Sequence, residues 1–279
     1  MIPAAFSYIR ANTVDEAVAA LAQHEDAKVL AGGHSLIPAL KLRLAQPRTL
    51  IDISRLSDLN YIHERNGRVM IGAMTTHYQI ESSAFLHERC PLLPQLAAQI
   101  GDVQVRNRGT IGGSLVHADP AADWPAAILA LEADLELAGP GGRRIVKASD
   151  FFVEMMQSAV QPNEVLCEIR VPVTGPTVAY AKFAQKASGF AIAGVAAVVE
   201  PKGKWVRVGI TGVASKAYRA TAVENALRGE ELTEAAITAA AEHASDEIET
   251  LNDIHASAEF RAHLAIVNTR RALLAAAAE

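Results

Sequence analysis

The sequence predicts an α+β protein made of two or three compact units, and three observations support this prediction. Its 279 residues are too many for one small core. Strand-like and helix-like segments are mixed along residues 1–175. Over residues 176–279 the strand-like segments come first and the helical ones follow, an order typical of an α+β domain.

The first unit, residues 1–57, reads as a compact group of strands and helices. Its expected elements are a helix at 14–24, a strand at 28–31, a helix at 36–44 and a strand at 49–53. Thr13 and Glu16 have the spacing of a capping box, in which each side chain accepts a hydrogen bond from the backbone amide of the other. Ser35 is placed to cap the second helix.

The second unit, residues 58–175, opens with a predicted β-hairpin. An alternating pattern at 61–72 is interrupted by Asn66-Gly67, the strongest short hairpin signal. Asp119-Pro120 looks like a helix start. The further expected elements are helices at 76–85, 91–100 and 121–131, and strands at 134–137, 144–146 and 164–172.

The third unit, residues 176–279, follows a boundary near Thr174-Gly175-Pro176. Its expected elements are antiparallel strands at 179–183, 191–200 and 205–213, and helices at 224–227, 234–248 and 258–278. A turn at 201–204 is expected to join the second and third of these strands.

Composition and charge exclude several classes of protein. The chain is 50% hydrophobic and 20% charged, as ordinary globular proteins are, so a disordered or fibrous protein is not indicated. Its net charge is -5 with scattered basic residues, which gives no electrostatic footprint for nucleic acid or an anionic membrane. An anionic ligand would therefore have to be held by backbone amides.

The two cysteines, Cys90 and Cys167, cannot form a disulfide framework or supply the four thiolates of an iron–sulfur cluster. The N-terminus lacks a signal-peptide pattern, and no run approaches the roughly 20 apolar residues of a membrane span. We therefore expect a cytoplasmic protein. Export within a complex whose signal lies on another chain is the open alternative.

Two glycine pairs are the strongest functional candidates. Residues 31–35 read AGGHS, and residues 110–114 read TIGGS. Consecutive glycines let a ligand reach the main chain, and successive amides in such a turn can point at one anion. Each pair is expected to lie just before a helix, whose amides and dipole add to the attraction. Two such loops suit a pyrophosphate, although each alone is more typical of a simple turn.

Other motifs are weaker. The spacing fails both the G-x-G-x-x-G fingerprint and the phosphate loop, so a Rossmann domain is not indicated. His117 and Asp119 lack further ligands at metal-site spacing and read as polar loop residues. His34 and Ser35 are sequence neighbours, which rarely face each other as base and nucleophile. Arg106 and Arg108 are interpreted as a solvated face.

Taken together, the two glycine segments resemble a known family. Residues 31–54 and 109–131 are similar to the flavin-binding medium subunit of molybdenum hydroxylases, such as carbon monoxide dehydrogenase and the xanthine dehydrogenase family. The segments 190–200, 210–220 and 257–264 resemble that family's flavoprotein C-terminal domain. The resemblance covers essentially the whole chain.

This resemblance implies a fold and a set of FAD-binding residues. The fold is that of the p-cresol methylhydroxylase and vanillyl-alcohol oxidase flavoproteins, with two α+β subdomains clasping FAD and a C-terminal α+β domain. The glycine segments would grip the pyrophosphate, Asp123 a ribose or adenine-side group, and Lys182 would approach the flavin ring with Leu166 against the cofactor. The implied cofactor-binding residues are Ala31, Gly32, Gly33, His34, Ser35, Leu36, Thr110, Ile111, Gly112, Gly113, Ser114, Asp123, Leu166 and Lys182.

The resemblance also implies an electron relay. A large molybdopterin-binding subunit would hydroxylate the substrate, and a small ferredoxin-like subunit with [2Fe–2S] clusters would pass electrons to FAD on this chain. The expected assembly is a dimer of heterotrimers, cytoplasmic or associated with the inner face of the membrane. The flavin supplies the redox chemistry, so no catalytic side chain is assigned.

Two other functions stay open at this point. One is a stand-alone FAD oxidase or reductase of the same fold, for which His34 and His117 could provide a covalent flavin link. The other is a scaffold that has lost its cofactor, which the intact glycine segments argue against. Neither the substrate of the complex nor the final electron acceptor is indicated by the sequence.

Overall fold

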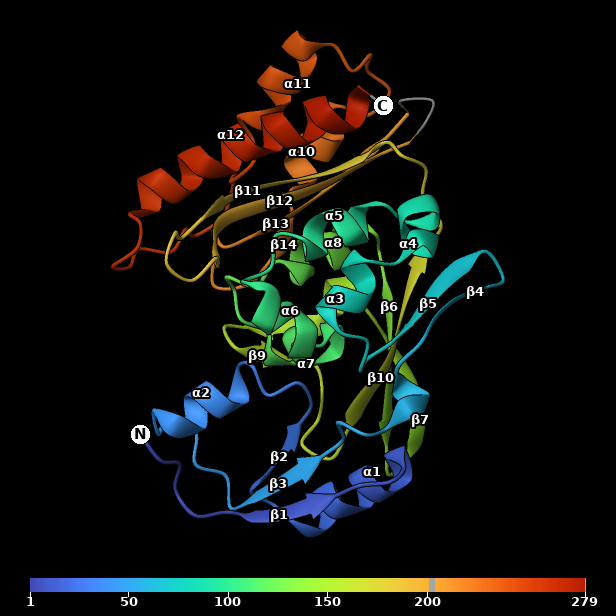
Figure 1. Ribbon diagram of the computed structural model, residues 1–279. Helices are drawn as coiled ribbons and strands as arrows, with labels where there is room; N and C mark the ends of the chain where they lie inside the picture. Colours follow the sequence, from blue (N-terminus) through green and yellow to red (C-terminus); the bar gives the residue numbers. More distant parts are fainter. Residues whose placement is uncertain (201–203, 279) are drawn as a thin grey trace.

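The computed structural model describes residues 1–200 and 204–278. Figure 1 shows three stacked layers that each contain a β-sheet, with the N-terminal sheet at the bottom and the C-terminal sheet at the top. The five-stranded sheet and most of the short helices lie between them. The chain is therefore of mixed α and β structure, as the sequence predicts.

The first sheet is parallel and has the strand order β1-β3-β2. Its central strand β3 is fully buried, while helix α1 covers the sheet with Ala17, Val18 and Leu21. The sequence pattern missed β1, whose residues are mostly exposed and so show no alternation. The elements of this part are β1 (Ser7–Arg10), α1 (Val14–Gln23), β2 (Ala27–Leu30), α2 (Leu36–Lys41) and β3 (Thr49–Asp52).

Two helix ends differ from the predictions. The Thr13 side chain accepts a hydrogen bond from the Glu16 amide, but the Glu16 carboxylate accepts from the amide of Asn12 at 2.8 Å, so half of the predicted capping box forms. Ser35 makes no side-chain capping bond. Helix α2 also ends early, because Arg43 has a φ of 59°, which breaks helical geometry.

The second sheet is antiparallel and has the order β4-β5-β10-β6-β7. Asn66 and Gly67 have φ values of 53° and 72°, as a tight hairpin turn requires, and the predicted hairpin is confirmed. The strands are β4 (Ile62–Arg65), β5 (Arg68–Gly72), β6 (Asp134–Gly139), β7 (Gly142–Lys147) and β10 (Val165–Pro172), with a small hairpin of β8 (Phe152–Glu154) and β9 (Gln157–Ser158) that was not predicted.

Short helices pack beside this sheet, and their bounds differ from several predictions. The predicted helix at 76–85 is interrupted because Ser83 caps a new helix, and the predicted helix at 91–100 ends at Ala97. Asp119 forms a local turn by accepting from the Ala121 amide, so the next helix starts later, at Trp124. The helices are α3 (His77–Glu81), α4 (Ala84–Arg89), α5 (Leu92–Ala97), α6 (Val103–Arg108), α7 (Ile111–His117), α8 (Trp124–Ala130) and α9 (Ala148–Phe151); a 3₁₀ turn spans Ser57–Leu59.

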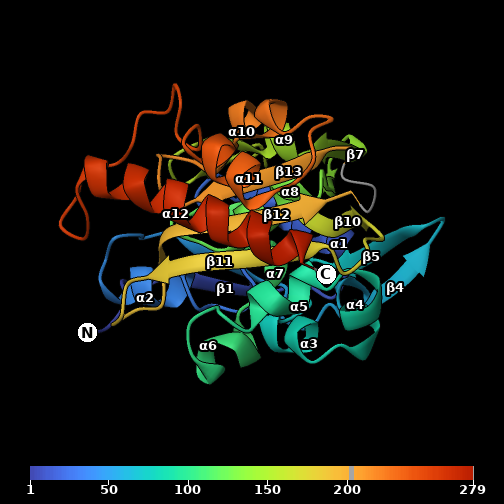
Figure 2. The same cartoon turned by 90° about the horizontal axis from the view of Figure 1, so that it is seen from above.

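The C-terminal sheet has the order β11-β12-β13-β14 and is antiparallel. Helix α12 crosses it on the outer side, as Figure 2 shows from above, and the fully buried α8 packs against β13 and β12. Gly209 permits this packing, because a Cβ there would lie 2.1 Å from the carbonyl oxygen of Ala126. The elements are β11 (Val178–Ala184), β12 (Ala191–Val199), β13 (Val206–Thr211), β14 (Tyr218–Arg219), α10 (Thr221–Ala226), α11 (Glu234–Ala241) and α12 (Ala258–Ala277).

The three strands predicted for this part are confirmed, and β14 is added to them. The turn predicted at 201–204 falls almost wholly on residues 201–203, outside the described residues. Over the ranges 1–200 and 204–278, no helix combines the length and the apolar character needed to cross a membrane.

Candidate functional site

The two glycine segments lie against each other in the folded chain. A Cβ on Gly32 would come within 2.1 Å of the carbonyl oxygen of Arg108, two residues before the second segment. A Cβ on Gly113 would lie 3.7 Å from the Cβ of Ala31. Bare backbone at Gly32 therefore lets segments almost 80 residues apart in sequence meet, and the 3.7 Å distance at Gly113 is an ordinary contact, so the two segments form two halves of one surface.

The first segment has the open backbone that an anion site needs. Gly33 has a φ of 77°, in the left-handed region that favours glycine. In the described part of the chain, no hydrogen-bond acceptor is found for the backbone amides of residues 32–35. His34 places Nδ1 3.2 Å from the carbonyl oxygen of Gly32, and Leu36 begins helix α2. The Ser35 hydroxyl is exposed.

The second segment is a helix, which corrects the sequence interpretation of a loop before a helix. Residues 111–117 form α7, and Thr110 caps it by accepting from the Gly113 amide at 3.1 Å. The other first-turn amides are also used, since those of Ile111 and Gly112 donate to carbonyls of the β5–α3 connection and that of Ser114 donates to Thr110. Gly112 is needed for packing, not for a turn, because a Cβ there would lie 2.6 Å from Ala73.

This finding changes what the second segment offers to a ligand. The amides of residues 111–114 are satisfied within the protein, so the groups left for an anion are the amide of Thr110 and the hydroxyls of Thr110 and Ser114. Thr110 Oγ1 accepts from Gly113 and keeps its own O–H for donation. The first segment thus supplies mainly backbone donors and the second mainly side-chain donors.

A pocket of about 270 Å³ opens beside the contact between the segments. No acidic side chain lines it, whereas two arginines do. Its lining residues are Ala31, Gly32, Ser54, Arg55, Leu56, Ser57, Asn60, Met74, Thr76, Asn107, Arg108 and Thr110. Half of these come from the segment that follows β3 and from the end of α6, and the sequence pattern did not single out Arg55, Asn60 or Asn107.

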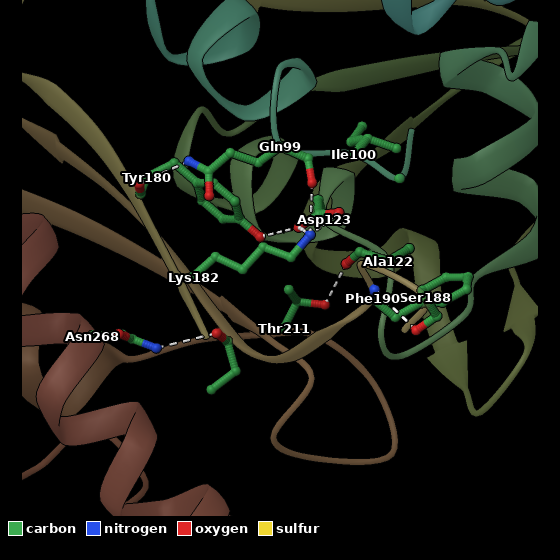
Figure 3. A network of polar contacts seen from close by, with 12 residues as sticks. Gln99, Ile100, Ala122, Asp123, Tyr180, Lys182, Ser188, Phe190, Thr211 and Asn268 are labelled. Atoms are coloured by element: carbon green, nitrogen blue, oxygen red, sulfur yellow. Dashed lines mark hydrogen bonds and ion pairs between the residues drawn. The ribbon is translucent and has the colours of Figure 1, made fainter. Parts of the chain in front are cut away.

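A buried ion pair joins the second part of the chain to the C-terminal sheet (Figure 3). Lys182 Nζ lies 2.8 Å from Oδ1 of Asp123, and the two side chains are 2% and 4% exposed. Lys182 also donates to the carbonyl of Gln99 at 3.0 Å, and the Tyr180 hydroxyl donates to Asp123 Oδ1 at 2.5 Å. Burial raises the pKa of Asp123, and the neighbouring ammonium opposes that shift. All these polar groups are thus satisfied within the protein.

The structure therefore separates the implied site residues into groups. It brings residues 31–36 and 110–114 together, and it joins Asp123 to Lys182 in a cluster that does not line the pocket. Leu166 lies in β10, buried in the same core cluster as Ile111. Tyr180 and Gln99 were missed because no local pattern marks a partner that lies 57 or 83 residues away.

The described residues contain no group of three or more His, Cys, Asp or Glu side chains that could hold a metal ion. His117 lies in the last turn of α7, and burial lowers the pKa of its imidazole. The sequence interpretation of both His117 and Asp119 as loop residues is wrong for His117, which lies in α7, whereas Asp119 lies in an Asx turn.

Two family models match the chain. Residues 4–174 match the FAD binding domain in molybdopterin dehydrogenase, and residues 178–276 match the CO dehydrogenase flavoprotein C-terminal domain.

Curated relatives of full length are similar to this chain. The carbon monoxide dehydrogenase medium chain of Hydrogenophaga pseudoflava is 44% identical, over 99% of this chain and 98% of that protein. The glyceraldehyde dehydrogenase medium chain of Sulfolobus acidocaldarius is 37% identical, over 98% of each.

The fold is also that of a solved relative. It matches carbon monoxide dehydrogenase from Hydrogenophaga pseudoflava with a TM-score of 0.96 and 44% identity, over 100% of this chain and 99% of that one. The resemblance in the two glycine segments is thereby confirmed: this chain belongs to the FAD-binding medium-chain family of molybdopterin dehydrogenases.

Proposed function

We propose that this chain is the FAD-carrying electron-transfer subunit of a molybdenum hydroxylase complex. It takes electrons from the [2Fe–2S] clusters of a partner subunit and passes them to a final acceptor. The observation that carries the proposal is the contact between the two glycine segments in a chain of this family. The names of the similar medium chains support the assignment to a complex of several subunits.

The residues at the contact fit a bound dinucleotide. The unpaired amides of residues 32–35 would hold the pyrophosphate, with Ser35, Thr110 and Ser114 adding hydroxyl donors. The left-handed Gly33 would keep the backbone open toward it. FAD, when bound, accepts electrons and releases them to an acceptor, and this chain binds, orients and shields it.

The contacts of Asp123, Lys182 and Leu166 limit the roles that we propose for them in the cofactor site. Because Asp123 and Lys182 lie within 2.8 Å of each other, they cannot serve opposite ends of an extended dinucleotide. We assign the pair to one end of the cofactor, where it fixes the C-terminal sheet against the second part of the chain. Leu166 supports the cofactor from β10 through its packing with α7.

We further propose the p-cresol methylhydroxylase and vanillyl-alcohol oxidase type of fold, with domains at 1–57, 58–175 and 176–279. The presence of one principal sheet in each of these ranges supports this division. The proposed partners are a large molybdopterin-binding subunit and a small [2Fe–2S] subunit, in a dimer of heterotrimers in the cytoplasm.

Flavin content tests the cofactor site. Gly33→Val should lose FAD because valine is strained at a φ of 77°, and Gly113→Val should lose it because a Cβ lies 2.8 Å from the capping Thr110 Oγ1. Ser35→Ala removes only an exposed hydroxyl and should weaken retention without changing stability. Gly141→Val is the matched control, since its Cβ meets nothing within 4 Å.

The readout is the ratio of flavin absorbance to protein in the purified chain, with circular dichroism as a measure of folding. Folded Gly33→Val and Gly113→Val proteins that both keep normal flavin would refute the site. The partner assignment has its own test, the isolation of the protein at native abundance with mass spectrometry of the co-purifying chains. A yellow protein that comes alone would favour a stand-alone flavoenzyme.

A further inference from the structure

The pocket beside Gly32 is lined by basic side chains and by no acidic one. Its lining holds Arg55 and Arg108 and no carboxylate, so its formal charge is +2 in a protein whose net charge is -5. The other pocket, of about 580 Å³, is lined by four basic residues and one acid, but its basic side chains are ion-paired within the protein: Asp134 lies against Arg68 and Lys147. There Glu132 forms ion pairs with both Arg207 and Arg219.

Arg108 differs from its neighbour Arg106, although sequence alone groups the two. Arg106 donates to Glu81 and to the carbonyls of Ile100 and Gly101, which makes it a structural residue. Among residues 1–200 and 204–278, Arg108 has neither a carboxylate within 4.0 Å nor a hydrogen-bond partner for its guanidinium. Its backbone is fixed, because its carbonyl packs on Gly32.

Arg55 is equally available for a ligand. The nearby carboxylate of Asp52 is already used, since it accepts from the Tyr8 hydroxyl and from the amide of Ser54. No partner for the Arg55 guanidinium is found in the part of the chain that the structure describes. Two arginines from different elements, the loop after β3 and the end of α6, therefore line one pocket without an internal counter-charge.

The other lining groups favour an oxygen-rich anion. The carboxamides of Asn60 and Asn107 make no side-chain hydrogen bond within the described residues, and they can donate to anionic oxygens. Guanidinium groups match phosphate geometry through paired N–H donors. The volume is below the range of about 300–1,000 Å³ typical of whole-ligand pockets, so a subsite for one part of a ligand is indicated.

We propose that Arg55 and Arg108 bind a phosphate group in this pocket and supply the positive charge that the glycine segments lack. The inference rests on the proposed function in one respect, because the pyrophosphate of FAD is the phosphate expected beside Gly32 and Thr110. A phosphate on a separate nucleotide has the same chemistry and is the second source.

The test uses the full-length chain freed of flavin and titrated with FAD, with fluorescence quenching as the readout. Inorganic pyrophosphate binding is measured by calorimetry, before and after FAD is loaded. The variants are Arg55→Gln, Arg108→Gln and the double substitution, and Arg65→Gln is the control at an exposed hairpin position. Arg108→Lys keeps the charge and should retain more affinity than Arg108→Gln.

We expect each glutamine variant to weaken FAD binding about tenfold, the loss of one charge-assisted contact, with no change for Arg65→Gln. Pyrophosphate should bind the flavin-free protein, lose affinity in the same variants and be excluded by FAD. Unchanged FAD affinity together with variant-sensitive pyrophosphate binding to the loaded protein would support the phosphate site and assign it to a separate ligand.

Two results separate the inference from the proposed function. If FAD and pyrophosphate both bind the double variant as tightly as the unmodified protein, the inference is overturned while the cofactor assignment stands. If the unmodified protein binds no FAD, the cofactor assignment fails. Pyrophosphate binding that depends on Arg55 and Arg108 would then support the phosphate site alone.

Discussion

Replacing Lys182 with methionine should strongly destabilise the protein, because it leaves the Asp123 carboxylate buried without its cation. Asp123 is 4% exposed and Lys182 2%, so water cannot take over the role of the ammonium. Tyr180 would remain as a hydrogen-bond donor to the carboxylate, and a neutral donor offsets only part of the loss. Methionine keeps most of the side-chain volume, so the change tests charge more than packing.

The magnitude follows from the burial of the pair. Breaking a buried ion pair by removing one partner costs about 3–5 kcal/mol. A chain of 279 residues has an unfolding entropy of about 0.6 kcal/mol/K, so the unfolding temperature should fall by roughly 5–9 °C.

The loss of stability in Lys182→Met should depend on pH. Burial already raises the pKa of Asp123, and the loss of Lys182 should raise it further above that of the unfolded chain. The loss of stability in Lys182→Met should therefore be small below the unfolded-state pKa of about 3.9, and it should grow as pH rises through the raised folded-state pKa of Asp123.

Urea denaturation at several pH values, followed by tryptophan fluorescence, measures this effect. The double substitution Lys182→Met with Asp123→Asn should recover part of the stability, because the buried charge is gone. A loss below about 1 kcal/mol at pH 7 would refute the reasoning, because solvent or another group would then neutralise Asp123. No recovery in the double variant would also refute it, because the loss would then come from packing and not from the unpaired charge.

Three further outcomes are expected. Thr110→Ala should cost about 1 kcal/mol of stability, because the Gly113 amide loses its cap, and Thr110→Ser should keep that stability. Equal stability of the two variants in urea would contradict the capping role. Gly209→Ala should destabilise the protein by about 1–3 kcal/mol, because its Cβ would lie 2.1 Å from a carbonyl oxygen of α8. Gly175→Ala is the control, since its Cβ meets nothing within 4 Å, and a thermal scan of both variants should show no change in its stability. Burial lowers the pKa of His77 to about 3. The free energy of unfolding should therefore fall as pH drops from 6.5 toward that value, by up to about 1.4 kcal/mol per pH unit. If His77→Gln has the same pH profile of stability as the unmodified protein, His77 is not the cause of this pH dependence.

Local patterns in the sequence determined much of the secondary structure and the family. The Asn66-Gly67 turn, the alternating strands and the position of the glycine pairs were readable because each depends on a few neighbouring residues. The strand β1 and the short helix α6 were missed, since four to six residues without apolar periodicity give no such signal.

Tertiary packing decided the conformation and the contacts of the candidate site. The segment 110–114 looks like a loop because glycine disfavours helix, yet it is helical, since Gly112 must pack on Ala73 and Thr110 caps the turn.

The sequence by itself determined the glycine segments, their order and the family. Only the tertiary structure decided that Gly32 touches Arg108, and that Asp123 is neutralised by Lys182, 59 residues away. Backbone propensity acts over a few residues, whereas burial and charge pairing depend on which distant elements pack together, and that is set by the fold.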